Sequence, residues 1–272
     1  MAESPILPIF EAGADPGPSF VDLLRRISPD ALTLPSSPNA TPLPFDAPHG
    51  TTVVAIRCEG GVVMAGDRRA TAGHSIANHR IEKVFPADDH SGVAIAGTAG
   101  LAVEMVRLFQ VQLEHYEKVE GEALSLEGKA NQLAQMVRAN LPAAMQGLVV
   151  VPLFAGYDLR RGHGRVFSYD AVGGKYEEAD FAANGSGSVH ARNWIKAGWR
   201  EDVDAGTAVD LAIRSLFAAA DEDTATGGPD LVRGIFPLVA TIDADGFRTM
   251  PESEVAERAQ ALLEGPERGG AA

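Results

Sequence analysis

The pattern of hydrophobic and polar positions changes abruptly at the Gly50–Thr51 bond. Residues 1–50 contain ten of the seventeen prolines and no lysine, and prolines recur too often there for a helix or a central strand. We therefore expect an extended or disordered leader. Within it, the spacing of Ser19 and Asp22 resembles a capping box, and an apolar stripe runs to Ile27. That segment fits a docking helix and a nascent helix in a flexible leader equally well.

After the leader, groups of strands alternate with pairs of helices. Period-two or continuous apolar runs predict strands, and apolar positions three and four residues apart predict helices. The first four strands are expected to form one small antiparallel sheet, and Pro142 should bend or interrupt the second helix. The expected strands are 51–58, 62–66, 83–85, 91–96, 148–157, 164–170, 176–183 and 235–243, and the expected helices are 100–118, 125–146, 186–199, 205–221 and 252–263.

This element order predicts an α+β architecture of two stacked sheets with helix pairs outside them. Long apolar strands such as 148–155 need cover on both faces, and the amphipathic helices supply that cover. We expect a domain of residues 51–272 preceded by the leader of residues 1–50.

Composition excludes several classes of function. The net charge of −14 argues against nucleic acid or an anionic membrane surface as the main partner. A single cysteine, Cys58, rules out an intramolecular disulfide, as is typical of a reducing compartment. No apolar run reaches the roughly 18 residues of a membrane span, and acidic Glu3 with two early prolines does not fit a secretory signal. We therefore expect a cytoplasmic protein.

The candidate chemistry begins at Thr51. If the Gly50–Thr51 bond were cut, Thr51 would carry a hydroxyl nucleophile and a free α-amine as base. Asp67 follows an apolar strand and Lys83 opens another, so both side chains could reach this residue. A lysine cation would lower the pKa of the hydroxyl, and a carboxylate would orient that lysine. Taken singly, each signal is weak, and the simpler interpretation is favoured: Asp67 as a turn residue paired to an arginine, and Lys83 as a solvated strand-end lysine.

Three loops supply further polar groups. Gly97 lies between a strand and a helix, where backbone N–H groups can bind negative charge; an ordinary tight turn is the alternative. The loop 185–188 is rich in Gly and Ser but matches neither a hydrolase elbow nor a dinucleotide fingerprint. The stretch after Asp223 reads as a helix end closed by glycines. The histidines have no metal-ligand spacing and no phosphate loop occurs, so we expect no metal and no cofactor.

Together these motifs resemble, in order and spacing, the proteasome β subunits, and the long leader is similar to that of the actinobacterial kind. The resemblance covers residues 50–264. It rests on Gly50-Thr51-Thr52-Val53, Gly66-Asp67-Arg68-Arg69-Ala70-Thr71, Lys83-Val84, Ala96-Gly97-Thr98, Gly185-Ser186-Gly187-Ser188 and Asp223-Thr224-Ala225-Thr226-Gly227-Gly228-Pro229-Asp230.

The resemblance implies a four-layer αββα sandwich of the N-terminal nucleophile hydrolase class and a self-processing threonine endopeptidase, made as an inactive precursor. It implies that Thr51 is the nucleophile, exposed by cleavage after Gly50, and that its α-amine is the base. Asp67 and Lys83 would form the activating pair, and the Gly97 N–H would bind the oxyanion. Supporting polar groups would be Ser186, Asp223 and Thr226, the last standing where many relatives have serine.

The resemblance also implies how substrates and partners bind. Thr71 would bond the substrate backbone as an added strand. An uncharged specificity pocket would favour cleavage after apolar or aromatic residues; its expected lining is Ala70, Ile81, Phe85, Ile95, Ala99 and Val103. Two β rings of seven would lie between two rings of α subunits, and a regulatory ATPase ring would feed in unfolded, tagged proteins, with no nucleic acid or membrane partner.

Two alternatives remain at this stage. A simpler bacterial threonine peptidase that pairs with a different ATPase typically lacks a fifty-residue leader and is shorter. A non-catalytic ring subunit would usually lose the threonine, the lysine or the acidic residue, and here all three are present. The N-terminus of the purified protein would separate these possibilities.

Overall fold

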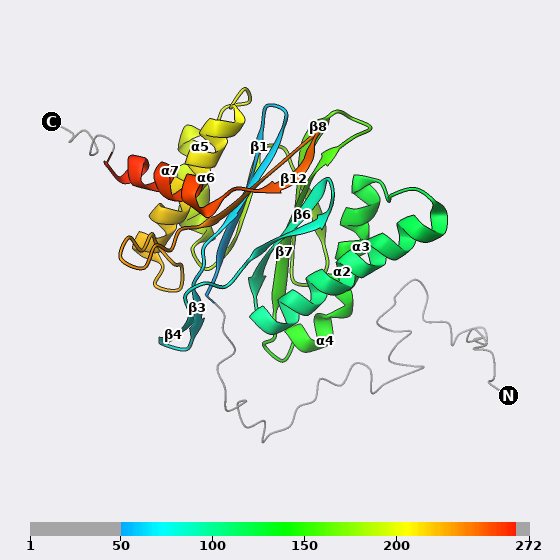
Figure 1. Cartoon of the computed structure of the whole chain (residues 1–272). Helices are drawn as coiled ribbons and strands as arrows, with labels where there is room; N and C mark the ends of the chain where they lie inside the picture. The colour runs from blue at the N-terminus through cyan, green and yellow to red at the C-terminus, as the bar shows by residue number, and fades with distance from the viewer. Residues whose placement is uncertain (1–49, 265–272) are drawn as a thin grey trace, which may run out of the picture. The chain divides into compact units, whose positions relative to one another are not determined.

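The computed structural model describes residues 50–264, and these form two five-stranded antiparallel sheets stacked face to face (Figure 1). The first sheet has the order β10 (Phe181–Gly185), β1 (Thr52–Cys58), β2 (Gly61–Gly66), β11 (Leu238–Asp243) and β12 (Gly246–Thr249). The second has the order β5 (Val84–Asp88), β6 (Ser91–Gly97), β7 (Val150–Asp158), β8 (His163–Tyr169) and β9 (Lys175–Glu178).

Helices cover the outer face of each sheet, on opposite sides of the sandwich in Figure 1. Against the second sheet pack α2 (Ala99–Glu120) and α3 (Leu126–Ala139), followed by the short α4 (Leu141–Ala144). Against the first sheet pack α5 (Ser188–Gly198), α6 (Ala205–Glu222) and α7 (Glu252–Glu264). The expected four-layer αββα sandwich is confirmed.

Three hydrophobic layers hold the sandwich together. The middle one, between the sheets, includes Val53, Met64 and Leu153, all fully buried. Successive side chains of a strand point to opposite faces, so β1 places Val53 and Ala55 in the middle layer and Val54 and Ile56 under the helices. This two-sided burial explains why the sequence of β1 is continuously apolar rather than alternating.

The expected grouping of the first four strands is wrong. β1 and β2 pair with each other in the first sheet, whereas β5 and β6 pair in the second. The polar stretch 68–80, for which no strand was expected, includes a separate hairpin of β3 (Ala70–Ala72) and β4 (Ser75–Asn78). That hairpin lies mostly at the surface, so its sequence lacks the apolar pattern that marks the core strands.

Two further boundaries differ from expectation. The single strand expected over 176–183 is two strands, β9 and β10, which belong to different sheets because the chain turns at 179–180. The strand β12 was not predicted, since only Gly246 of its four residues is buried. The second helix, by contrast, is interrupted near Pro142 as expected: α3 stops at Ala139, and the separate short α4 has the proline in its first turn.

Within residues 50–264 no helix is long and apolar enough to cross a membrane. The expected helical stripe 19–27 lies outside the described residues.

Candidate active site

The Gly50–Thr51 bond lies where the N-terminal end of β1 meets the C-terminal end of β6. Thr51 is almost completely buried, and its hydroxyl donates a hydrogen bond of 2.6 Å to the carbonyl oxygen of Gly50. A small pocket beside it is lined by Thr51, Lys83 and Gly97, among others. The two sheets therefore bring three residues singled out in the sequence to one place.

Lys83 and Asp67 form a buried ion pair beside this bond. The distance from Lys83 Nζ to Asp67 Oδ1 is 2.6 Å, and the two side chains are 3% and 0% exposed. Lys83 also donates to the carbonyl oxygens of Arg69, at 2.6 Å, and Gly50, at 3.2 Å. Burial lowers the pKa of Lys83, and the Asp67 charge opposes that effect only in part. All three ammonium hydrogens have acceptors, so the cation is held in one orientation.

The Asp67 carboxylate is fixed equally firmly. Its Oδ1 accepts from the Thr52 N–H at 2.8 Å in addition to Lys83. Its Oδ2 accepts from the N–H groups of Arg69, at 2.9 Å, and Gly227, at 2.8 Å. Both oxygens therefore have two donors each, which is the satisfaction that a buried charge requires.

A second polar cluster lies on the other side of Thr51. The Ser186 N–H donates to the Thr51 carbonyl at 2.9 Å, and the Ser186 hydroxyl donates to Asp223 Oδ2 at 2.5 Å. Thr226 donates to the same carboxylate oxygen at 2.6 Å. Burial of Asp223 acts to raise its pKa, but the hydrogen bonds from Ser186 and Thr226 outweigh burial, and the pKa lies below its usual value.

Gly97 ends β6 one residue before the N-cap of α2, as the strand-to-helix pattern predicts. Its φ of +114° is strained for other residues. A Cβ atom at Gly97 would also lie 2.1 Å from the Val149 carbonyl oxygen. The backbone can reach this position beside Thr51 only with glycine.

The pocket next to Thr51 contains most of the side chains expected for specificity. Five of the six line it: Ala70, Ile81, Ile95, Ala99 and Val103. The sixth, Phe85, is absent from the lining and packs instead against the hydrophobic cluster under α2 and α3. Glu82 and Ala102 line the pocket although the sequence analysis did not name them. With the bond intact the pocket leaves only about 10 Å³, the space of a single water molecule.

Thr71 lies directly beside Gly50. A Cβ atom built on Gly50 would be 2.6 Å from Thr71 Oγ1 and 2.7 Å from both the Cβ and the carbonyl oxygen of Ala225. Real Cβ contacts are longer, so Gly50 fills the only space that these two neighbours leave. The residue before Thr51 must therefore be small for steric reasons.

Several groups of the site were missed by the sequence analysis. The carbonyl and N–H of Arg69 and the N–H of Gly227 hold Lys83 and Asp67. Because every residue type has these backbone atoms, the sequence alone does not indicate which of them belong to the site. Thr52 was read only as part of a strand, yet its backbone and its side chain both bond to site residues.

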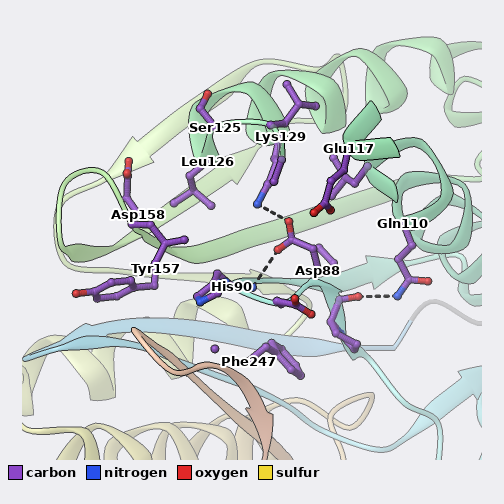
Figure 2. Close-up of a pocket in the computed structure, with 18 of the residues that line it drawn as sticks. Asp88, His90, Gln110, Glu117, Ser125, Leu126, Lys129, Tyr157, Asp158 and Phe247 are labelled. Atoms are coloured by element: carbon purple, nitrogen blue, oxygen red, sulfur yellow. Dashed lines mark hydrogen bonds and ion pairs between the residues drawn. The ribbon is translucent and has the colours of Figure 1, made fainter. Parts of the chain in front are cut away.

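Figure 2 shows a much larger groove, of about 1020 Å³, whose lining does not include Thr51. It is lined by the β5–β6 and β11–β12 turns and by α2 and α3. The Ser91 end of β6 borders it, whereas the Gly97 end borders Thr51, and a seven-residue strand spans about 20 Å. Two buried polar residues that line the groove are paired: Lys129 with the half-buried Asp88, and Asp158 with Arg165, which does not itself line the groove.

Within residues 50–264, no three His, Cys, Asp or Glu side chains are grouped so that they could hold a metal ion.

A four-layer αββα sandwich that places a threonine at the head of a central strand, beside a buried Lys–Asp pair, has the architecture of the N-terminal nucleophile hydrolase class. The chain belongs to the proteasome subunit family, whose model, described as "Proteasome subunit", matches residues 47–232. That match includes the whole second sheet, three of the five strands of the first sheet (β1, β2 and β10) and the site residues from Thr51 to Thr226.

Curated relatives agree with this family and indicate the kind of subunit. The chain is 60% identical over 256 residues to the proteasome subunit beta of Acidimicrobium ferrooxidans, covering 94% of this chain and 93% of the relative. It is 56% identical to that of Streptomyces griseus, covering 90% and 88%. It is 57% identical to that of Acidothermus cellulolyticus, covering 87% and 83%. The first alignment is longer than residues 50–272, so it includes part of the segment before Gly50.

Proposed function

We propose that this chain is the precursor of a catalytic proteasome β subunit, in which residues 1–50 are a propeptide and residues 51–272 are the catalytic domain. The observation that carries the proposal is the contact at the boundary. The Thr51 hydroxyl donates to the Gly50 carbonyl oxygen at 2.6 Å, and Lys83 donates to the same oxygen at 3.2 Å. The proposed nucleophile and a cation thus both donate hydrogen bonds to the carbonyl group of the bond that is to be cut.

Maturation then proceeds by attack of the Thr51 oxygen on the Gly50 carbonyl carbon. The C–O bond of an ester forms, the C–N bond breaks, and the hydroxyl proton ends on the released α-amine. Water hydrolyses the ester, which restores the hydroxyl and leaves a carboxylate on Gly50. While the bond is intact, the nitrogen of Thr51 is an amide and cannot act as a base, so the precursor is silent.

The mature residue uses the same hydroxyl on substrates. The α-amine, whose ordinary pKa is about 7.7–8.0, accepts the hydroxyl proton as Thr51 attacks a peptide carbonyl. The substrate C–N bond breaks, the proton passes to the leaving amine, and an acyl-enzyme remains for water to hydrolyse. The Lys83 cation favours the ionised hydroxyl, and Asp67 keeps that cation in place.

The remaining polar groups stabilise charge or orient the amine. The Gly97 N–H would donate to the oxyanion, which is the kind of backbone donor whose loss costs roughly 100-fold or more in rate. Ser186, Asp223 and Thr226 would orient the α-amine and its water. Support comes from the bonds of Ser186 to Thr51 and to Asp223.

Substrates would bind as an added strand beside Thr71, with an apolar side chain in the pocket next to Thr51. The apolar lining of Ile81, Ile95 and Val103 supports a preference for cleavage after apolar or aromatic residues. We further propose a cytoplasmic 28-subunit particle, with two heptameric β rings between α rings and an ATPase ring that delivers unfolded or tagged proteins. The relatives' names support the assembly and leave its stoichiometry to experiment.

Mass spectrometry of the protein co-expressed with its α subunit tests the proposal directly. We expect the β chain to begin at Thr51 and the particle to hydrolyse apolar fluorogenic peptides. The Thr51→Ala variant should assemble with full-length β chains and show no activity. A mature-length, active Thr51→Ala particle would refute the mechanism.

A further inference from the structure

The hydroxyl of Thr52 is the second member of a chain of hydrogen bonds that all run in one direction, from the Gly187 N–H to Asp223. Thr226 uses its single hydroxyl hydrogen on Asp223 Oδ2, at 2.6 Å, because an ionised carboxylate only accepts. The 2.5 Å bond between Thr226 Oγ1 and Thr52 Oγ1 must then be donated by Thr52. Thr52 Oγ1 in turn accepts from the Gly187 N–H at 3.0 Å. Every hydrogen from Gly187 to Asp223 is thereby assigned.

The same residue holds the other half of the site through its backbone. The Thr52 N–H donates to Asp67 Oδ1, the oxygen that pairs with Lys83. Thr52 therefore connects the two carboxylates. Its N–H donates to Asp67, and its hydroxyl is linked to Asp223 through the hydroxyl of Thr226. Its side chain is fully buried, so water cannot replace these partners.

The local packing leaves no room for another arrangement. A Cβ atom at Gly187 would lie 2.6 Å from Thr52 Oγ1 and 2.8 Å from Thr226 Oγ1. Glycine at 187 thus permits the close approach of three chain segments: the start of β1, the loop before α5 and the loop after α6. The loop before α5 carries Ser186, whose N–H and hydroxyl both face Thr51 or Asp223.

We propose that Thr52 is a positioning residue of this site, whose hydroxyl fixes the loop that carries Ser186 and orients Thr226 toward Asp223. It touches neither the scissile bond nor the pocket, so it acts through Ser186, Thr226 and Asp223. Removal of the hydroxyl leaves the Gly187 N–H and one Thr226 lone pair without partners in a buried place, which is costly. The loop relaxes, and the orientation of Ser186 relative to Thr51 is lost.

The inference rests on the proposed threonine peptidase function, and it predicts effects on rate and on pH dependence. A hydroxyl that receives a hydrogen bond is a better donor, so Thr52 strengthens the bond from Thr226 to Asp223. Without Thr52, Asp223 keeps more negative charge on its oxygens and favours the protonated α-amine. The acidic limb of the pH–rate profile should therefore move to higher pH.

The test compares Thr52→Val, which keeps the shape and loses the hydroxyl, with Thr52→Ser, which keeps the hydroxyl. In the assembled particle we expect Thr52→Val to lower kcat by roughly 10- to 100-fold, with KM within about twofold, and to shift the acidic limb upward. Thr52→Ser should restore both values to near wild type. Ser215→Ala is the matched control, because it removes another fully buried hydroxyl, one that bonds only to Ala212 within α6.

A second arm does not depend on activity. Hydrogen exchange is measured on particles with the Thr51→Ala precursor, with and without Thr52→Val. We expect the Gly187 amide to lose protection when the Thr52 hydroxyl is removed. If Thr51→Ala particles stay active, the proposed function fails, while this arm still decides the role of Thr52. If Thr52→Val behaves like Ser215→Ala in kcat, pH profile and exchange at Gly187, or if Thr52→Ser is as impaired as Thr52→Val, the inference about Thr52 is wrong.

Discussion

Asp67 and Lys83 form a buried ion pair of 2.6 Å although they flank strands of different sheets. Asp67 directly follows β2 in the first sheet, and Lys83 directly precedes β5 in the second. The pair thus joins the two layers at the end of the sandwich where Thr51 lies. Two charges at such a place are costly to desolvate, so their retention fits a chemical role better than a stabilising one.

We predict that Lys83→Met destabilises the fold as well as blocking processing. Removal of the cation leaves the Asp67 charge buried with backbone donors alone, and breaking a buried pair costs about 3–5 kcal/mol. Thermal and urea unfolding of Thr51→Ala precursors with and without Lys83→Met would measure this. Lys118→Met is the matched control, since the Lys118–Glu114 pair is highly exposed and its loss should change little. Equal effects of the two variants would contradict the buried-pair argument.

Asp67→Asn should also abolish processing, for a geometric reason. In one amide orientation the NH₂ group would face the N–H groups of Arg69 and Gly227, and in the other it would face Lys83 and the Thr52 N–H. In either orientation the amide hydrogens would face other hydrogen-bond donors in a buried place, which is unfavourable. We expect an uncut β chain by mass spectrometry, and normal processing by Asp67→Asn would show that the carboxylate charge is dispensable.

Gly50→Ala should slow maturation at least tenfold while leaving the mature enzyme unaltered. The added methyl group would clash with Thr71 Oγ1 and Ala225, and a misplacement of about 1 Å at a reacting bond can cost 100-fold in rate. The time course of leader release by mass spectrometry measures this rate. Once cut, the chain has the wild-type sequence, so specific activity per mature chain is the internal control. A cleavage rate equal to wild type would mean that Thr71 and Ala225 move aside to accommodate the methyl group without displacing the bond.

The sequence predicted the layers and much of the site, and its failures have physical causes. Strands and helices with strong apolar periodicity appear close to their expected bounds, whereas the polar hairpin β3–β4 and the short β12 had no such signal. Lys83 and Asp67 were expected to meet through neighbouring strands of one sheet. They meet instead because two sheets face each other, a relation between residues distant along the chain that no local pattern encodes.

The contributions of backbone atoms and of packing were the least predictable. The Arg69 carbonyl and the Gly227 N–H bond to the Lys83–Asp67 pair regardless of their side chains. Phe85 was assigned to the specificity pocket by resemblance, but it packs under the helices. Glu82, three residues earlier in the chain, does line the pocket.

The pocket predicts a measurable cleavage preference. Its lining is apolar apart from Thr51 itself, the exposed Glu82, and Lys83, whose ammonium hydrogens all have acceptors. A charged substrate side chain would lose hydration there without gaining a partner. We expect a peptide panel to show cleavage after Leu, Phe or Tyr at least ten times faster than after Asp or Arg. Glu82→Gln should keep that order, and faster cleavage after Arg would contradict the assignment of this pocket.

The hydrogen bonds to Asp223 predict how stability depends on pH. Burial opposes ionisation of Asp223, but donors from Ser186, Thr226 and the Ala225 N–H outweigh it and hold the pKa of Asp223 below its ordinary value. Because the folded pKa is depressed, the stabilisation is fully present above the unfolded pKa of about 3.9 and is lost as pH falls through the folded value. Urea unfolding of Thr51→Ala precursors with and without Asp223→Asn should give a difference in unfolding free energy that is constant between about pH 5 and 7. That difference should shrink below about pH 4, and one that stayed constant into that range would show that Asp223 ionises in the folded protein as it does in the unfolded chain.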